Sequence, residues 1–229
     1  MPYSETFDRL FREGRAAVLA GRHRCETPPI DGGSRYGLSV VLRPDDRLAR
    51  RMAELGAEAR TAAGGGHWPS GDADLVHVTV RALETFRPAV PEDDIAVGRY
   101  VTAMRCATRG PIRLRFAGLA LTPAGVMACA WPLDDAATGF AWTLADELGA
   151  DGWFEAGLRR DVWYAMLMHF SGPIAHPRRL VEWVTSRRSL EIGDTAIDRA
   201  LLCQWVPDHR RPAPRVLASV PLGERSTVG

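Results

Sequence analysis

The sequence contains no lysine and no asparagine, and only one glutamine, in 229 residues. All 29 basic residues counted as Lys or Arg are therefore arginines. Without lysine, the chain cannot have a phosphate-binding loop ending in Gly-Lys-Ser/Thr, a Schiff-base amine or a lysyl-nucleotide adduct. Any phosphate must be bound by arginine, hydroxyl or backbone groups.

Net charge and long apolar runs are also scarce. The formal charge is +1, so no global field draws the chain to nucleic acid or anionic lipid, and we expect neither a long RNA nor a membrane as partner. Charged residues interrupt the apolar positions between 7 and 18, which argues against a signal peptide and predicts a cytoplasmic protein. The four cysteines lack paired spacing, which indicates reduced thiols rather than disulfides or a zinc site.

A hydrophobic content of 46% with 25% charged residues is typical of a globular protein. Residues 4–20 carry apolar side chains at helical spacing, and residues 22–33 are rich in proline and glycine. We therefore expect an N-terminal helix and linker over 1–33, with the helix packed on the outside of the main domain at 34–229.

Beyond the linker, the hydrophobic pattern predicts one order of elements twice: a strand, a helix, a glycine-rich loop and a strand that brings a histidine. The predicted strands are 36–42, 75–83, 113–121, 126–131, 163–171, 195–206 and 216–220. The predicted helices follow Pro44 and cover 91–109, 138–148 and 177–187, with loops at 61–74 and 149–161. This repetition indicates a duplicated α+β fold.

A His-x-Ser/Thr tripeptide occurs on one strand of each series, as His77-Val78-Thr79 and as His169-Phe170-Ser171. Strand alternation places each imidazole and its hydroxyl on one face, and it puts Leu167 on the face of His169 and Ser171. Two such pairs suit a phosphodiester: one imidazole takes a proton, the other protonates the departing oxygen, and the hydroxyls hold the phosphate oxygens. This chemistry needs no metal ion.

Over residues 36–205, the sequence resembles the two-histidine phosphoesterase superfamily, the 2′-5′ RNA ligase and cyclic phosphodiesterase-like (LigT-like) proteins. The resemblance rests on HVTV at 77–80, the hairpin at 113–131 and HFS at 169–171. It implies a bilobal fold with two antiparallel sheets flanked by helices and a cleft between the lobes. It also implies metal-independent hydrolysis of 2′,3′-cyclic phosphates or 2′,5′-linked nucleotides, with nucleotides or RNA ends as substrates.

The resemblance makes His77 and His169 the acid and base, in an order left open, and Thr79 and Ser171 the phosphate-binding hydroxyls. Gly172 and Pro173 follow the second motif, so its strand is expected to end early. The N-terminal helix and linker lie outside the resemblance and are expected either to cover the cleft or to form an interface.

Four further residues are candidates for substrate binding. Arg81 shares the predicted face of the first motif and suits a phosphate or a carboxylate, although a solvated arginine is the alternative. His67 and Trp68 lie in the glycine-rich loop, where they could stack on a base or be ordinary loop residues. Tyr36 begins the first strand, either lining the cleft or packing in the core.

Two alternatives remain at this stage. A metal site would combine His67 and His77 with nearby aspartates, or His169 with His176, but these spacings match no known ligand pattern, so we expect neither metal nor cofactor. The scaffold could also be a non-catalytic nucleotide- or RNA-binding module, or a biosynthetic enzyme for a phosphorylated small molecule. Any RNA-joining activity would have to reverse the two-histidine reaction, because no lysine is present.

Overall fold

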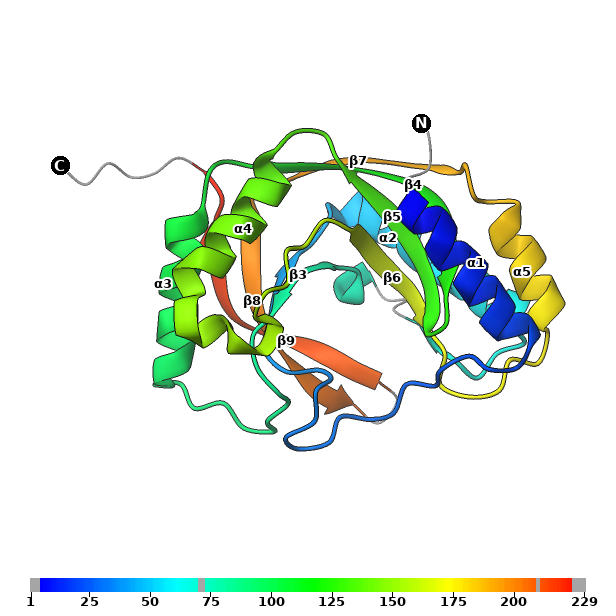
Figure 1. Ribbon diagram of the computed structural model, residues 1–229, viewed down its shortest axis with the longest axis horizontal. Helices are drawn as coiled ribbons and strands as arrows, with labels where there is room; N and C mark the ends of the chain where they lie inside the picture. Colours follow the sequence, from blue (N-terminus) through cyan, green and yellow to red (C-terminus); the bar gives the residue numbers. More distant parts are fainter. Residues whose placement is uncertain (1–4, 70–72, 209–210, 224–229) are drawn as a thin grey trace.

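The computed structural model describes residues 5–69, 73–208 and 211–223, and in them one curled antiparallel sheet carries most of the fold (Figure 1). The strand order is β7-β4-β5-β6-β3-β1-β8-β9, and the short β2 pairs with β6. The strands are β1 (Ser39–Leu42), β2 (Trp68–Pro69), β3 (Val78–Ala82), β4 (Ile112–Thr122), β5 (Gly125–Pro132), β6 (Trp163–His169), β7 (Glu191–Ile197), β8 (Arg199–Asp208) and β9 (Arg211–Pro221).

The expectation of two separate sheets is wrong. The strands β3 and β6, which come from the two predicted series, pair with each other at Val78 and Ala165 and so join all the described strands into one sheet. The α+β class is confirmed, whereas the bilobal duplication stays a prediction. The early end predicted for the second motif strand is confirmed, because β6 ends at His169.

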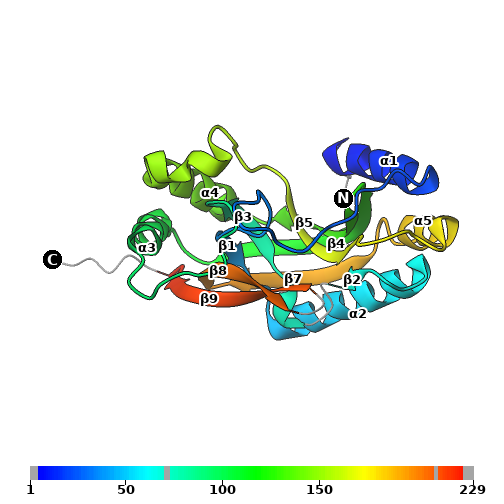
Figure 2. The same ribbon diagram turned by 90° about the horizontal axis from the view of Figure 1, so that it is seen from below.

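Five α-helices pack around the sheet within the described residues: α1 (Glu5–Leu19), α2 (Asp46–Ala63), α3 (Ile95–Ala107), α4 (Ala136–Leu148) and α5 (Pro177–Thr185). Figure 2 shows α1 and α4 on one side of the sheet and α2 on the other. Two 3₁₀ helices, η1 (Ala73–Leu75) and η2 (Gly149–Glu155), occupy parts of the predicted loops. No helix among the described residues is both long and apolar enough to span a bilayer.

Capping explains where two helices begin. Asp45 accepts a hydrogen bond from the backbone N–H of Leu48 and starts α2. Asp94 accepts one from the N–H of Val97, so α3 begins at Ile95 rather than at the predicted residue 91. The predicted strand at 195–206 is two strands, since β7 ends at Ile197 and β8 begins two residues later.

Both faces of the sheet are buried in its central region, as β5 shows. Its even-numbered residues Val126 and Ala128 belong to the main hydrophobic core, while Met127 and Cys129 on the opposite face belong to a second cluster with Phe7 of α1. A strand buried on both faces reads as a continuous apolar run, as 126–130 does. The second cluster extends to partly buried side chains of β6, so α1 covers the face on which the candidate site lies.

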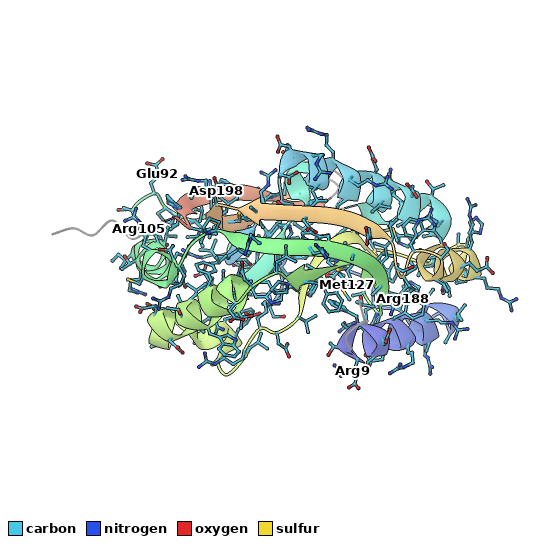
Figure 3. The ribbon with its side chains drawn as sticks, turned by 90° about the horizontal axis from the view of Figure 1, so that it is seen from above. Arg9, Glu92, Arg105, Met127, Arg188 and Asp198 are labelled. Atoms are coloured by element: carbon cyan, nitrogen blue, oxygen red, sulfur yellow. The ribbon has the colours of Figure 1, made fainter. Side chains whose placement is uncertain are left out.

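The N-terminal helix packs on the outside of the sheet, as the sequence predicts. Figure 3 shows Met127 and Arg188 between the strands and α1, and Arg188 donates a hydrogen bond to Asp8 of that helix. At Gly14 the helix approaches β4 so closely that an added Cβ would lie 2.5 Å from the backbone carbon of Leu121. A glycine is therefore required at this crossing.

Candidate active site

The two predicted histidine motifs meet at the centre of the sheet. His77 immediately precedes β3, and His169 is the last residue of β6. Because these strands are antiparallel neighbours, the beginning of β3 and the end of β6 lie at the same end of the strand pair. His77, His169 and Thr79 all line one cavity of about 290 Å³.

A bulge in β3 decides which of its side chains reach the cavity. Consecutive residues of β1 lie opposite Thr79 and Arg81, so Val80 is an extra residue in the pairing. An extra residue shifts the following side chains to the other face of a strand. Thr79 and Ala82 consequently line the cavity, and Arg81 does not. The expectation that strict alternation keeps Arg81 on the face of the motif is wrong.

A second bulge has the same effect in β6. Consecutive residues of β5 lie opposite Met166 and Met168, which leaves Leu167 as the extra residue. Leu167 is buried in the main core, whereas Tyr164, Met166 and His169 line the cavity. The expectation that Leu167 shares the face of His169 is therefore wrong, although the histidine itself faces the cavity.

The surroundings of His77 fix its tautomer. Its Nδ1 lies 2.6 Å from the carbonyl oxygen of Leu75, and a carbonyl can only accept, so Nδ1 carries the proton and Nε2 holds the free lone pair of the neutral ring. The indole of Trp205 lies 4.7 Å from the imidazole, centroid to centroid. Burial lowers the pKa of His77, and the nearby charge of Arg43 acts in the same direction.

His169 has a different environment. Its Nδ1 is buried and has no hydrogen-bond partner among the described residues, and a carboxylate oxygen of Glu26 lies 3.9 Å away. Burial lowers the pKa of His169 from 6.5 to about 3, and the positive charge of Arg35 acts in the same direction, as does His77 when it is protonated. Both imidazoles are therefore neutral at pH 7 in the free protein.

Aromatic rings form much of the cavity wall, which includes Tyr36, Trp68, Phe154, Tyr164 and Trp205. Tyr36 and Trp68 are the two substrate-binding candidates that the structure brings to the cavity. The backbone of Tyr36 has a φ of 64°, a left-handed conformation that strains a bulky residue. Such strain persists only where surrounding contacts hold it, and it is concentrated at functional sites.

Charged side chains lie at one end of the same wall. Arg35, Glu155 and Arg160 line the cavity. Arg160 donates to the carbonyl oxygen of Val80 at 2.7 Å and to the Glu155 carboxylate at 3.2 Å. The other oxygen of that carboxylate accepts from the backbone N–H of Ala82 at 3.1 Å, so the segment after η2 is held against β3.

Arg81, a third substrate-binding candidate, is bound to other parts of the protein instead of facing the cavity. Its side chain is buried, and the guanidinium donates to the carbonyl oxygens of Gly152, Glu155 and Leu158 at 2.8–3.2 Å. These carbonyls belong to η2 and the residues that follow it. Arg81 therefore holds the segment that carries Phe154 and Glu155 to the cavity, and it does not face the cavity itself.

Ser171 and His67 also lie away from the cavity lining. The hydroxyl of Ser171 donates to the carbonyl oxygen of Gly66 at 3.1 Å, and its backbone N–H donates to Nδ1 of His67 at 3.4 Å. His67 is 3% exposed and contacts the ring of Phe170 edge-on. The two side chains thus join the glycine-rich loop to the end of β6, and Thr79 is the motif hydroxyl that the structure brings to the cavity.

The sequence alone does not identify Glu26 and Arg35, because the prolines and glycines of this part of the chain predict only a linker. The backbone N–H of Glu26 donates to the carbonyl oxygen of Phe170 at 2.6 Å, which places the linker beside His169. Its carboxylate accepts from Arg35 at 2.7 Å and from the Tyr36 hydroxyl at 3.1 Å. These contacts hold the linker beside His169, and its two expected roles, covering the cleft or forming an interface, stay predictions.

Solved structures with the same arrangement of elements are known. The chain is similar to TT0787 of Thermus thermophilus, with 17% identity and a TM-score of 0.58 over 82% of this chain and 99% of that one. It is equally similar to E. coli LigT complexed with 3′-AMP, with 14% identity, a TM-score of 0.58 and the same coverage. The chain has the LigT fold. A structure described as a phosphoesterase follows at 12% identity and a TM-score of 0.57.

The LigT fold confirms, at the level of structure, the resemblance that the two histidine motifs indicate. No protein-family model matches the chain, and no curated protein does. Within the described part of this LigT-like chain, no group of three or more His, Cys, Asp or Glu side chains is placed to hold a metal ion. The groups that the cavity offers for chemistry are two imidazoles, the hydroxyls of Thr79 and of serine and tyrosine residues, and the charged side chains.

Proposed function

We propose that this protein is a phosphodiesterase that hydrolyses a 2′,3′-cyclic phosphate or a 2′,5′-linked nucleotide by paired-histidine catalysis, without a metal ion. The observation that carries the proposal is that His77 and His169, from strands far apart in sequence, line one cavity together with Thr79. Hydrolysis of a phosphodiester needs a base for the attacking oxygen and an acid for the departing one. Two imidazoles in one cavity supply both groups.

His77 is the base in this scheme. Its Nδ1–H is donated to Leu75 and its lowered pKa keeps the ring neutral, so Nε2 can accept a proton at pH 7. Nε2 takes the proton of a water molecule or a substrate hydroxyl while the oxygen of that group forms a bond to phosphorus. The tautomer seen in the free protein is the one that this step requires.

His169 is the acid. In the free protein its ring is neutral, but a bound phosphodiester brings a negative charge, and an opposite charge within about 4–6 Å raises the pKa of an imidazole. The protonated ring then gives its Nε2 proton to the ribose oxygen as the bond between that oxygen and phosphorus breaks. The hydroxyl of Thr79 donates to a non-bridging oxygen as charge develops there. An RNA-joining reaction would run these steps in reverse.

The cavity suits a nucleotide in size and chemistry. A volume of about 290 Å³ is at the lower end of the range of roughly 300–1,000 Å³ for ligand pockets, which favours a mononucleotide end over a long RNA. Its aromatic walls offer surfaces for stacking a base, and base–aromatic stacking contributes roughly 1–3 kcal/mol per base. Solved structures of E. coli LigT hold 3′-AMP and ATP, which supports a nucleotide as the ligand of this chain.

A panel of 2′,3′-cyclic, 3′,5′-cyclic and 2′,5′-linked nucleotides tests the proposal. We expect turnover of at least one 2′,3′-cyclic or 2′,5′-linked substrate, and a loss of roughly 10²- to 10⁴-fold in kcat for His77→Ala and for His169→Ala. His176→Ala is the matched control, because His176 is exposed, makes no side-chain capping bond and lies outside the cavity lining. A chelator should leave the rate unchanged.

Three results would overturn the proposal: turnover that survives both histidine substitutions, turnover that disappears with a chelator, or tight binding of 3′-AMP with no substrate converted. The last result would favour a nucleotide-binding module. The salt dependence of the nucleotide affinity would then report the number of phosphate contacts. A steep loss of affinity with salt indicates many contacts, and a shallow loss indicates the few contacts of a mononucleotide.

A further inference from the structure

Backbone hydrogen bonds fix the segment between α1 and β1 to the turn between β4 and β5 and to the residue that follows β6. Arg24 donates its N–H to Pro123 at 2.6 Å, and Glu26 donates its N–H to Phe170 at 2.6 Å. Phe170 directly follows His169. These contacts hold the backbone of Glu26 beside the candidate acid, so the position of its side chain does not depend on a free loop.

The carboxylate of Glu26 is nearly buried, with 10% of its side chain exposed. Arg35 donates to Oε1 at 2.7 Å and the Tyr36 hydroxyl donates to Oε2 at 3.1 Å. Oε1 also faces His169, whose Nδ1 lies 3.9 Å away. Carboxylate oxygens have several lone pairs, so Oε1 can accept from Arg35 and from an imidazole N–H together.

The two cavity histidines therefore differ at Nδ1. In His77, Nδ1 is hydrogen-bonded to the carbonyl oxygen of Leu75, whereas in His169 it is buried without a hydrogen-bond partner among the described residues. A buried unpaired ring nitrogen is costly, and a carboxylate oxygen of Glu26 lies 3.9 Å from this one. A carboxylate behind a histidine fixes its tautomer and stabilises the imidazolium.

We propose that Glu26 is the positioning residue of His169. When substrate is bound, Glu26 accepts the Nδ1–H of His169, and the contact shortens by about 1 Å to a hydrogen bond, as active-site contacts do on going from free enzyme to complex. The proposal rests on the proposed function, in which His169 gives its Nε2 proton to the departing oxygen. The Nδ1 proton stays on the ring, which returns to the neutral Nδ1–H form. The N-terminal linker is thus part of the catalytic machinery.

The charged groups around His169 define the competing interpretation. Arg35 and Tyr36 come from the same segment as Glu26, and His77 comes from the start of β3. In the competing interpretation, Glu26 acts only as the structural partner of Arg35 and Tyr36. The two interpretations differ in what the removal of the carboxylate does to the imidazole itself.

Glu84 offers a matched control. Its carboxylate accepts from Arg87 at 2.5 Å and from the Tyr100 hydroxyl at 3.1 Å, the same two kinds of partner that Glu26 has. Unlike Glu26, it has no ion-pair contact with His169 among the described residues. Replacing Glu84 therefore reproduces the loss of an arginine–tyrosine–glutamate cluster without removing a group from the site.

The first measurement needs no turnover. The ¹⁵N chemical shifts of the imidazole report which nitrogen carries the proton, and the His169 signal is assigned by its loss in His169→Ala. Even at 3.9 Å, the Glu26 carboxylate favours a proton on the ring nitrogen that faces it, so we expect the Nδ1–H form to dominate in the wild-type protein. We expect this form to fall at least threefold relative to the Nε2–H form in Glu26→Met, while Glu84→Met has no effect. An unchanged tautomer ratio in folded Glu26→Met would overturn the proposal, even if the phosphodiesterase activity is confirmed.

The second measurement uses the substrate that the nucleotide panel identifies. Glu26→Gln keeps the shape and removes the charge, and we expect kcat to fall about 10- to 100-fold with little change in KM. In the His169→Ala background the same substitution should cause no further loss, because Glu26 acts through that ring. An equal loss in both backgrounds would overturn the proposal. If no substrate is found, the proposed function fails, and the tautomer measurement still decides the role of Glu26.

Discussion

Replacing Arg81 by methionine tests which of two roles this residue has. The sequence suggests that it contacts the substrate, whereas the structure shows that it holds a segment of the protein in place. The guanidinium is buried and donates to three carbonyl oxygens, those of Gly152 at 3.2 Å, Glu155 at 2.8 Å and Leu158 at 3.2 Å. Methionine keeps much of the side-chain length but donates no hydrogen bond. We expect Arg81→Met to destabilise the fold and to loosen η2 together with the residues that follow it.

The magnitude follows from the three bonds. A hydrogen bond to a charged group contributes about 1.5–3 kcal/mol, and three of them set an upper bound well above the net loss. Methionine avoids the desolvation cost of the guanidinium, and water can reach a loosened segment, so we expect a net loss of about 3 kcal/mol. With a urea m-value of about 2–3 kcal/mol/M, the unfolding midpoint should fall by about 1–1.5 M.

Urea unfolding and steady-state kinetics together form the assay. Arg159→Met is the control, because Arg159 is exposed and its partners, Asp146 and the ring of Trp142, lie at the surface. A surface ion pair or cation–π contact contributes about 1 kcal/mol or less. In Arg81→Met we expect KM to rise and kcat to stay within about threefold, since the loosened segment carries Phe154 to the cavity wall. A variant as stable as the wild type but inactive would refute this reasoning and restore Arg81 as a substrate contact.

Three further predictions follow from the structure. Gly14→Ala places a Cβ against the backbone of β4, so we expect a loss of about 1–3 kcal/mol in urea unfolding, and an unchanged midpoint would mean that α1 docks differently. The pKa values of His77 and His169 are lowered in the fold, so the unfolded chain binds protons first. The free energy of unfolding should therefore fall as the pH drops from about 7 to about 4, by at most about 1.4 kcal/mol per unit for each histidine, and a higher urea midpoint at pH 5 than at pH 7 would contradict this. Ser171→Ala should leave kcat within about twofold and Thr79→Val should lower it about 10- to 100-fold, whereas equal losses would return the serine to the site.

Alternation in the sequence is informative only where each strand residue faces one partner residue. It correctly predicts that His77 and Thr79 lie on the same side of their strand, since both line the cavity. It fails at Arg81 and Leu167, because each follows or forms a bulge that depends on the neighbouring strand. The hydrophobic pattern of a single strand does not show how that strand pairs with its neighbour, and this pairing decides where a bulge occurs.

Long-range pairing limited the rest of the prediction. The family resemblance implies two sheets, but the pairing of Val78 with Ala165 joins the strands into one. This pairing is a contact between distant segments, which the hydrophobic pattern of each segment does not show. Glu26 was missed for a similar reason. Proline and glycine in a linker predict the absence of regular structure, but they do not show which strand end the linker contacts.

The joint between β3 and β6 is narrow, since within the described residues these two strands pair at one position, Val78 with Ala165. One candidate catalytic histidine comes from each side of this joint. Few ladder hydrogen bonds oppose a change in the angle between the two sides, so the width of the cavity is easily adjusted to a bound ligand. The N-terminal linker crosses from the end of β6 to the start of β1, and its contacts with both sides limit how far the joint can open.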